Sequence, residues 1–324
     1  MKPKIVLVMD FPKNIEHADL SRKDLEGYNC LASRLTRETF EEFATVKLYT
    51  DLEKFAKRIL FHKNSIVFPM RWGITSRTAK GLIPSLCETH GIQYVGADSY
   101  TQILCNDKYL SKMYARDFGL QVPRGLLIRK EQIVSKIQTA IEYLTYPVVI
   151  KPNFGGGSSG ISSDSIADSA DAALALIHRL FEYNFSPVLV EEYVEGYEVS
   201  LLLVGNKSGI QYCDEIQLSI KEESFFKHSL WGFETKKVDL FSAHYVPSSH
   251  IATSDREKAE QLFLSFEKAD YLRIDGRVNE NGFFVIELSP DCYIGPESDF
   301  SVAFKQRGSS LSDFYQILVS LVQL

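Results

Sequence analysis

The sequence has few of the features that mark the common classes of binding protein. Its five cysteines are scattered along 324 residues without a CxxC pair, which suits free thiols in a reducing compartment. No apolar run approaches the ~20 residues of a membrane span, and the first apolar run is too short for a signal peptide. A net charge of −6 gives no reason to expect nucleic acid or an anionic membrane as partner. We therefore expect a cytoplasmic protein that binds neither.

The two common phosphate-binding loops, GxxxxGK[ST] and GxGxxG, are also missing. Instead, Lys151 follows the apolar run Val148–Ile150 and precedes a Gly/Ser loop that contains Ser158 and Ser159. The run predicts a buried strand that would hold Lys151 rigidly at its end. The loop offers N–H and hydroxyl groups without bulk, which suits nucleotide phosphates. From these residues alone, a phosphate site and a flexible hairpin both stay open.

Two carboxylates lie on a predicted β-hairpin late in the sequence. An alternating run, Tyr271–Val278, is followed by an Asn/Gly turn and the apolar run Phe283–Leu288, which predicts two paired strands. Asp275 and Glu287 lie twelve residues apart on these strands, and we expect them to face the same side. Such a pair suits Mg²⁺, which takes one or two carboxylates plus substrate phosphates. A solvated hairpin is the alternative, but a carboxylate within an apolar strand needs a partner.

A third acidic group stands between these two motifs. Glu191 ends an apolar run, Gly196 marks a turn, and Glu198 opens a second apolar strand. Taken together, the three motifs resemble the ATP-grasp superfamily and, within it, the D-alanine–D-alanine ligases. The family's order is a lysine, a strand–Lys–Gly/Ser loop, E-x-x-(apolar)-x-G-x-E, a loop lysine, R-(apolar)-D and E-x-N. All but the last appear in this order between about residues 100 and 300.

The resemblance implies an α/β protein of the α+β ATP-grasp type in three parts. These are an N-terminal parallel α/β domain at 1–100, a central ATP-grasp subdomain at 101–187, and a C-terminal ATP-grasp subdomain with the metal site at 188–324. Periodicity predicts strands at 5–8, 46–49, 66–68 and 94–95. It predicts helices at about 25–43, 52–59, 79–90, 107–118, 133–144, 169–183 and 310–322.

The resemblance also implies ATP as cofactor and assigns residues to it. In chain order these are Lys108 and Lys151 on the α- and β-phosphates, Ser158 and Ser159 over the β- and γ-phosphates, Glu191 and the Val194 backbone on adenine, Glu198 on the ribose hydroxyls, and Lys236, which resembles the lysine of the family's mobile loop.

For the chemistry, the resemblance implies that Arg273 faces the developing oxyanion, with Lys151 and Lys236 acting on the phosphoryl group. Asp275 and Glu287 would hold Mg²⁺, or Mn²⁺ in its place. The family's third ligand is an Asn, where this chain has Ser289. A hydroxyl is a poorer ligand than an amide oxygen, so a water molecule or Asp291 would complete the site.

Two further segments depart from the family pattern where it contacts substrate. The N-terminal stretch around Glu16–His17 lacks Gly-Gly, and Arg71–Gly81 replaces an acidic, glycine-rich loop. We therefore expect an altered pocket for the first substrate. Arg71, Arg77 and Lys80 favour a carboxylate with additional negative charge, unless these side chains point to solvent.

The expected activity is an ATP-dependent, ADP-forming carboxylate–amine ligase that makes an amide bond through an acyl phosphate. Its partners would be small carboxylate and amine substrates, and a homodimer is compatible with the resemblance. Three alternatives stay open: an authentic D-alanine–D-alanine ligase, a phosphoryl-transfer relative that forms no amide, and a non-catalytic nucleotide-binding protein whose metal site Ser289 has weakened.

Overall fold

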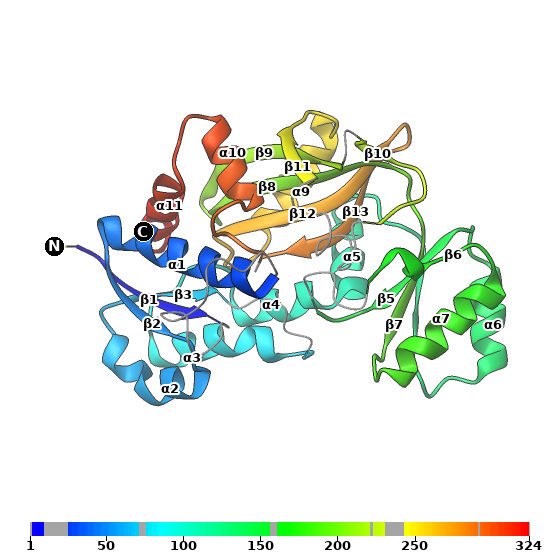
Figure 1. Ribbon diagram of the computed structural model, residues 1–324, viewed down its shortest axis with the longest axis horizontal. Helices are drawn as coiled ribbons and strands as arrows, with labels where there is room; N and C mark the ends of the chain where they lie inside the picture. The colour runs from blue at the N-terminus through cyan, green and yellow to red at the C-terminus, as the bar shows by residue number, and fades with distance from the viewer. Residues whose placement is uncertain are drawn as a thin grey trace.

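The computed structural model describes residues 2–9, 25–70, 76–155, 161–220, 223–230, 243–290 and 292–323. Within these residues the strands form three sheets (Figure 1). The N-terminal sheet lies at the lower left of the view, the large sheet above it, and the small sheet in a lobe at the right.

The N-terminal sheet is parallel, in the order β2-β1-β3. Its strands are β1 (Lys4–Met9), β2 (Thr45–Tyr49) and β3 (Ile66–Met70), and its helices are α1 (Leu25–Phe43), α2 (Leu52–Arg58) and α3 (Leu82–His90). Short 3-10 turns, η2 (Ile59–His62) and η3 (Ala79–Gly81), follow α2 and precede α3. The predicted strand at 94–95 is wrong, because Tyr94 forms only an isolated bridge to Val67.

Two helices where we predicted one connect this sheet to the rest of the chain. α4 (Ser99–Asn106) and α5 (Lys108–Asp117) meet at Asp107. The side chains of Asp98 and Asp107 accept hydrogen bonds from the first turns of α4 and α5 and so fix where each helix begins. Both helices contribute side chains to the apolar core beneath the large sheet.

The small sheet is antiparallel, in the order β4-β7-β5-β6. Its strands are β4 (Gly125–Ile128), β5 (Val148–Pro152), β6 (Ile166–Ala167) and β7 (Val188–Glu192), and α6 (Val134–Glu142) and α7 (Ala170–Glu182) pack against it. The single 3-10 turn η4 (Ser163–Ser165) leads into β6. The predicted boundary between 187 and 188 separates β7 from the strands with which it pairs. We propose instead that the small lobe runs from Gly125 to Glu192.

The large sheet has the order β11-β9-β8-β12-β13, with β10 paired to β8. Its strands are β8 (Gly196–Asn206), β9 (Gly209–Ile220), β10 (Phe225–Phe226), β11 (Ala243–Pro247), β12 (Tyr271–Asn279) and β13 (Gly282–Ser289). The predicted hairpin is confirmed as β12 and β13. Helix α9 (Thr253–Leu264) lies between β11 and β12 in the chain, and α10 (Asp299–Gln306) and α11 (Leu311–Gln323) follow β13.

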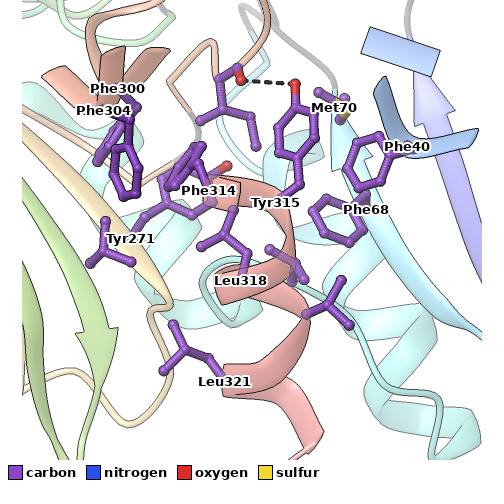
Figure 2. Packing of buried hydrophobic residues seen from close by; sticks show 14 of the residues in the cluster. Phe40, Phe68, Met70, Tyr271, Phe300, Phe304, Phe314, Tyr315, Leu318 and Leu321 are labelled. Carbon is purple, nitrogen blue, oxygen red and sulfur yellow. Dashed lines mark hydrogen bonds between the residues drawn. The ribbon is translucent and has the colours of Figure 1, made fainter. Parts of the chain in front are cut away.

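The C-terminal helix α11 joins the N-terminal and large sheets through one apolar core (Figure 2). Tyr315 stacks on Phe40 of α1 with ring centroids 4.1 Å apart, and its hydroxyl donates to the carbonyl of Ile294. Phe314 stacks on Phe300 of α10. The N-terminal sheet and the large sheet therefore pack against the same core, which fixes the position of the large-sheet strands. No helix of the described residues is long and apolar enough to cross a membrane.

Candidate active site

A cavity of about 210 Å³ lies where the small and large sheets meet. Eight of the twelve residues predicted for the site line it: Lys108, Lys151, Glu191, Val194, Glu198, Arg273, Asp275 and Glu287. They come from α5, both sheets and the segment between β7 and β8. Ser158, Ser159 and Lys236, together with the alternative metal ligand Asp291, lie outside the described residues.

A β-bulge brings the two hairpin carboxylates face to face. From Asn279 to Gly276 the β12 residues pair regularly with β13, but the register shifts between Asp275 and Gly276. The shift leaves Ile286 as the extra residue, so Asp275 pairs with Glu287. In an unbroken hairpin Asp275 would oppose Ile286. The predicted convergence of the two carboxylates therefore depends on this bulge.

Arg273 lies between two carboxylates at one end of the cavity. Its guanidinium nitrogens are 2.7 and 2.9 Å from the two oxygens of Asp275 and 2.6 Å from Asp299 at the start of α10. Burial alone would lower the pKa of Arg273, but these two carboxylates outweigh it and raise the pKa well above its ordinary value. Arg273 is therefore a permanent, fixed cation. Burial raises the pKa of Asp275, although Arg273 opposes this.

Glu287 faces the lysines at the other side of the cavity. Its Oε1 is 3.4 Å from Nζ of Lys108, which also donates to the carbonyl of Gly155. Burial alone would raise the pKa of Glu287, but Lys108, Lys80 and Lys151 lower it, with Arg273, to about 2. Glu287 is therefore ionised at any working pH.

Lys151 and Glu191 are neighbours on one face of the small sheet. Val149 pairs with Glu191 across β5 and β7, so Lys151, two residues on, lies diagonal to it. Nζ of Lys151 contacts Oε1 of Glu191, while Nζ of Lys112 on α5 contacts Oε2. Burial and the nearby Lys108 ammonium lower the pKa of Lys151 to about 7, although Glu287 and Glu198 oppose this shift. The side chain of Glu191 is thus fully engaged by lysines.

The chain turns sharply at Gly196 between the two sheets. The φ of Gly196 is +152°, and a Cβ there would collide with the backbone of Val278 on β12. The turn directs Glu198, two residues later, toward the cavity, where Arg277 donates to its carboxylate at 2.8 Å. The glycine in the acidic motif is therefore a steric requirement of the fold.

Ser289 is buried at 7% exposure and pairs with Arg273 across the hairpin, and it is not among the residues that line the cavity. Within the described parts of the chain, no three His, Cys, Asp or Glu side chains form a metal-binding group. Asp275 and Glu287 nevertheless present paired carboxylate oxygens toward the cavity, a donor type that fits Mg²⁺. Arg273 and Lys108 neutralise these oxygens in the structure.

Four residues of the site were missed by sequence reasoning: Lys112, Tyr245, Arg277 and Asp299. Lys112 follows Lys108 by one helical turn and Arg277 follows Asp275 by two strand positions, so their periodicity could have revealed both. Tyr245 and Asp299 carry no such signal. The phenol of Tyr245 lines the cavity, and burial and the nearby Asp299 raise its pKa well above the ordinary value.

The basic segment before α3 only partly reaches the cavity. Lys80 is near enough to Glu287 to help lower its pKa. Arg77 instead lies over the ring of Phe154 at 5.8 Å and lines two hollows outside the cavity. Arg71 lies outside the described residues.

Residues 114–322 match the family model described as "D-ala D-ala ligase C-terminus". This range covers both sheets of the cavity but only the last four residues of α5, so Lys108 and Lys112 lie before it.

Two relatives named D-alanine–D-alanine ligase are each 27% identical to this chain. The match to the Caldicellulosiruptor bescii protein covers 67% of this chain but only 58% of that protein. The match to the Streptococcus gordonii protein covers 82% and 74%. The fold is similar to that of a D-alanine–D-alanine ligase from Bacillus anthracis complexed with ATP, with a TM-score of 0.71, 15% identity, and coverage of 100% and 97%.

Proposed function

Because the chain belongs to the D-ala D-ala ligase C-terminus family, we propose that it is an ATP-dependent, ADP-forming ligase that joins a carboxylate to an amine. The observation that carries this proposal is the convergence of separate charged groups in one cavity. Lys108, Lys151, Arg273, Asp275 and Glu287 come from α5, β5 and the β12–β13 hairpin and line the same space. Alternating cations and carboxylates there suit a polyphosphate and its counterions.

ATP would bind with its phosphates near Lys108 and Lys151, with Ser158, Ser159 and Lys236 as further contacts by resemblance. The adenine ring would contact the segment between β7 and β8. Lysines occupy both carboxylate oxygens of Glu191, and its backbone pairs with Val149 across the central strand of the small sheet. We therefore assign the adenine contact to the backbone of Val194. Glu198, with its carboxylate in the cavity, would accept from the ribose hydroxyls.

The chemistry begins with the poor reactivity of a carboxylate toward amines. Transfer of the γ-phosphoryl group of ATP to the carboxylate gives an acyl phosphate, which an amine can attack. Lys151 and Lys236 would offset charge on the phosphoryl group during transfer. Arg273, held by Asp275 and Asp299, would stabilise the oxyanion of the tetrahedral intermediate. Phosphate then leaves and the amide remains.

Magnesium would be held by Asp275 and Glu287, with Mn²⁺ as a substitute, and with Ser289, Asp291 or water in third place. When bound, the metal supplies positive charge that neutralises phosphate oxygens. In the structure, Arg273 and Lys108 neutralise the two carboxylates that would hold the metal.

For the substrate, we propose a carboxylate other than D-alanine. Support comes from Lys80, a basic residue within electrostatic reach of Glu287, in a segment that departs from the family pattern. An authentic D-alanine–D-alanine ligase is the second candidate, favoured by the names of the relatives.

The test is a turnover assay on the full chain with ATP, Mg²⁺ and mixtures of D- and L-amino acids. We expect ADP and phosphate to form only with amino acid present, with one amide product per ADP by mass spectrometry. Phosphorylated product without amide would contradict the ligase assignment. ATP binding without turnover on any mixture would favour the non-catalytic alternative.

A further inference from the structure

Arg277 lines the cavity and donates five hydrogen bonds to described residues. It lies on β12 directly opposite Glu198 on β8, so both side chains leave the sheet on one face. Its Nη2 is 2.8 Å from Oε2 of Glu198. The arginine side chain is 5% exposed and that of Glu198 is 30% exposed. The register of the large sheet therefore places a buried cation behind a carboxylate that faces the cavity.

The other donors of Arg277 bind two separate segments. Nη1 donates to the Tyr193 hydroxyl at 3.1 Å, to the Phe226 carbonyl at 3.3 Å and to the Val194 carbonyl at 3.4 Å. Nη2 also donates to the carbonyl of Ser229 at 3.1 Å. The guanidinium lies over the rings of Tyr193 and Phe226. These contacts fix the planar group on several sides, so it cannot follow a movement of Glu198.

Glu198 is fixed by this arrangement on one side only. Oε2 accepts from Arg277, whereas Oε1 has no hydrogen-bond partner in the part of the chain that the structure describes. Burial alone would lower the pKa of Arg277, but Glu198 and Tyr193 raise it, so the arginine keeps its charge. A glutamate side chain without such an anchor has several rotamers and loses freedom when it is ordered. Here that ordering is done before a ligand arrives.

We propose that Arg277 is a positioning residue that orients Glu198 toward the nucleotide ribose and thereby sets the preference for ATP over 2′-deoxyATP. This inference rests on the proposed function, because it takes the cavity to be an ATP site. A carboxylate held in place accepts hydrogen bonds from both ribose hydroxyls. A nucleotide without the 2′-hydroxyl leaves a held acceptor unpaired, and sites of this kind discriminate strongly. A freely rotating Glu198 turns to solvent and discriminates little.

The experiment compares the Kd values of ATP and 2′-deoxyATP by titration calorimetry. We expect the wild-type protein to bind ATP roughly tenfold more tightly than 2′-deoxyATP, a ratio typical of one lost charged hydrogen bond. Arg277→Met should reduce the ratio to about twofold or less, mainly by weakening ATP. Arg277→Lys keeps the buried charge but not the planar fork, so it should give a reduced ratio in a folded protein. Glu198→Gln should also reduce the ratio.

Arg256→Met is the matched control. Arg256 on α9 pairs with the buried Glu215 of β9, and neither residue lines the cavity. This variant should lower the thermal midpoint and leave the ATP to 2′-deoxyATP ratio unchanged. A folded Arg277→Met or Arg277→Lys protein with the wild-type ratio would overturn the inference. Equal wild-type affinity for the two nucleotides would overturn it and leave ATP binding intact, whereas binding of neither would overturn the proposed function as well.

Discussion

Lys112 on α5 forms an ion pair with Glu191 on β7, and the two side chains are only 2% and 3% exposed. The second oxygen of the same carboxylate contacts Lys151. If nucleotide phosphates draw Lys151 away, Lys112 remains as the partner of Glu191. A buried carboxylate without a partner is strongly unfavourable, so Lys112 would make such a movement of Lys151 possible.

Lys112→Met should therefore weaken ATP binding by about tenfold or more, because Lys151 becomes the last partner of Glu191. The thermal midpoint should also fall. Adding Glu191→Gln to Lys112→Met removes the charge that retains Lys151 and should recover most of the ATP affinity. Calorimetric Kd values for the single and double variants test this. A double variant that binds ATP no better than Lys112→Met would contradict the explanation.

Lys151→Ala should abolish ATP turnover in a folded protein, because a methyl group cannot hold a phosphate. Phosphate release and far-UV circular dichroism on the same sample measure both properties. Lys258→Ala is the control, since Lys258 pairs with Asp255 on α9 and does not line the cavity. Turnover near the wild-type rate in the Lys151→Ala variant would remove this lysine from the site.

ATP affinity should fall as the pH rises above about 7. The pKa of Lys151 is about 7 in the free protein, and nucleotide phosphates stabilise the ammonium, so they raise this pKa on binding. Above pH 7 the free lysine is mostly neutral and binding must take up a proton, which weakens affinity by up to about tenfold per pH unit. Below pH 7 the affinity should be nearly level.

Calorimetry in two buffers of different ionisation enthalpy measures that proton uptake directly. Lys151→Arg is the companion variant, since an arginine stays charged throughout the range. It should bind ATP with little change between pH 7 and 9. A wild-type protein with no proton uptake at pH 8 would show that Lys151 does not titrate on binding.

Glu287→Gln should raise the Mg²⁺ concentration needed for half-maximal turnover by about tenfold or more, because one of two carboxylate ligands is lost. Glu280→Gln is a matched control on the same hairpin, where Glu280 is exposed at the turn. Magnesium titrations of the two variants should differ clearly. An unchanged titration for Glu287→Gln would argue against a metal at the hairpin.

The hairpin also shows how far the sequence could predict the site. Alternation and the Asn/Gly turn predicted β12 and β13, and the apolar setting of Glu287 predicted a partner for it. The bulge at Ile286 was not foreseen, because an extra residue in an apolar strand resembles its neighbours. Without it Asp275 and Glu287 would not be paired.

Other differences have similar physical causes. α4 was missed because its short sequence lacks a long apolar period, although Asp98 is a recognisable cap. β7 was assigned to the wrong sheet because strand sequence does not identify pairing partners. Asp299 at the start of α10 contacts Arg273, which lies 26 residues earlier in the chain. No local sequence pattern predicts a contact at that separation. Local periodicity therefore predicted most helices and strands, but it did not predict which distant elements pair or contact one another.

The identity of the carboxylate substrate gives the last prediction. Lys80 acts electrostatically on Glu287, so a substrate bound beside Glu287 would also feel its charge. We expect an acidic amino acid to support faster phosphate release than D-alanine when a panel of acidic, bulky and small amino acids is compared. Lys80→Gln should reduce that advantage by about two- to fivefold, as the loss of one partly screened charge implies. Arg77→Gln should not, because Arg77 lies over Phe154 away from the cavity. Turnover on D-alanine that exceeds every other member of the panel would instead establish an ordinary D-alanine–D-alanine ligase.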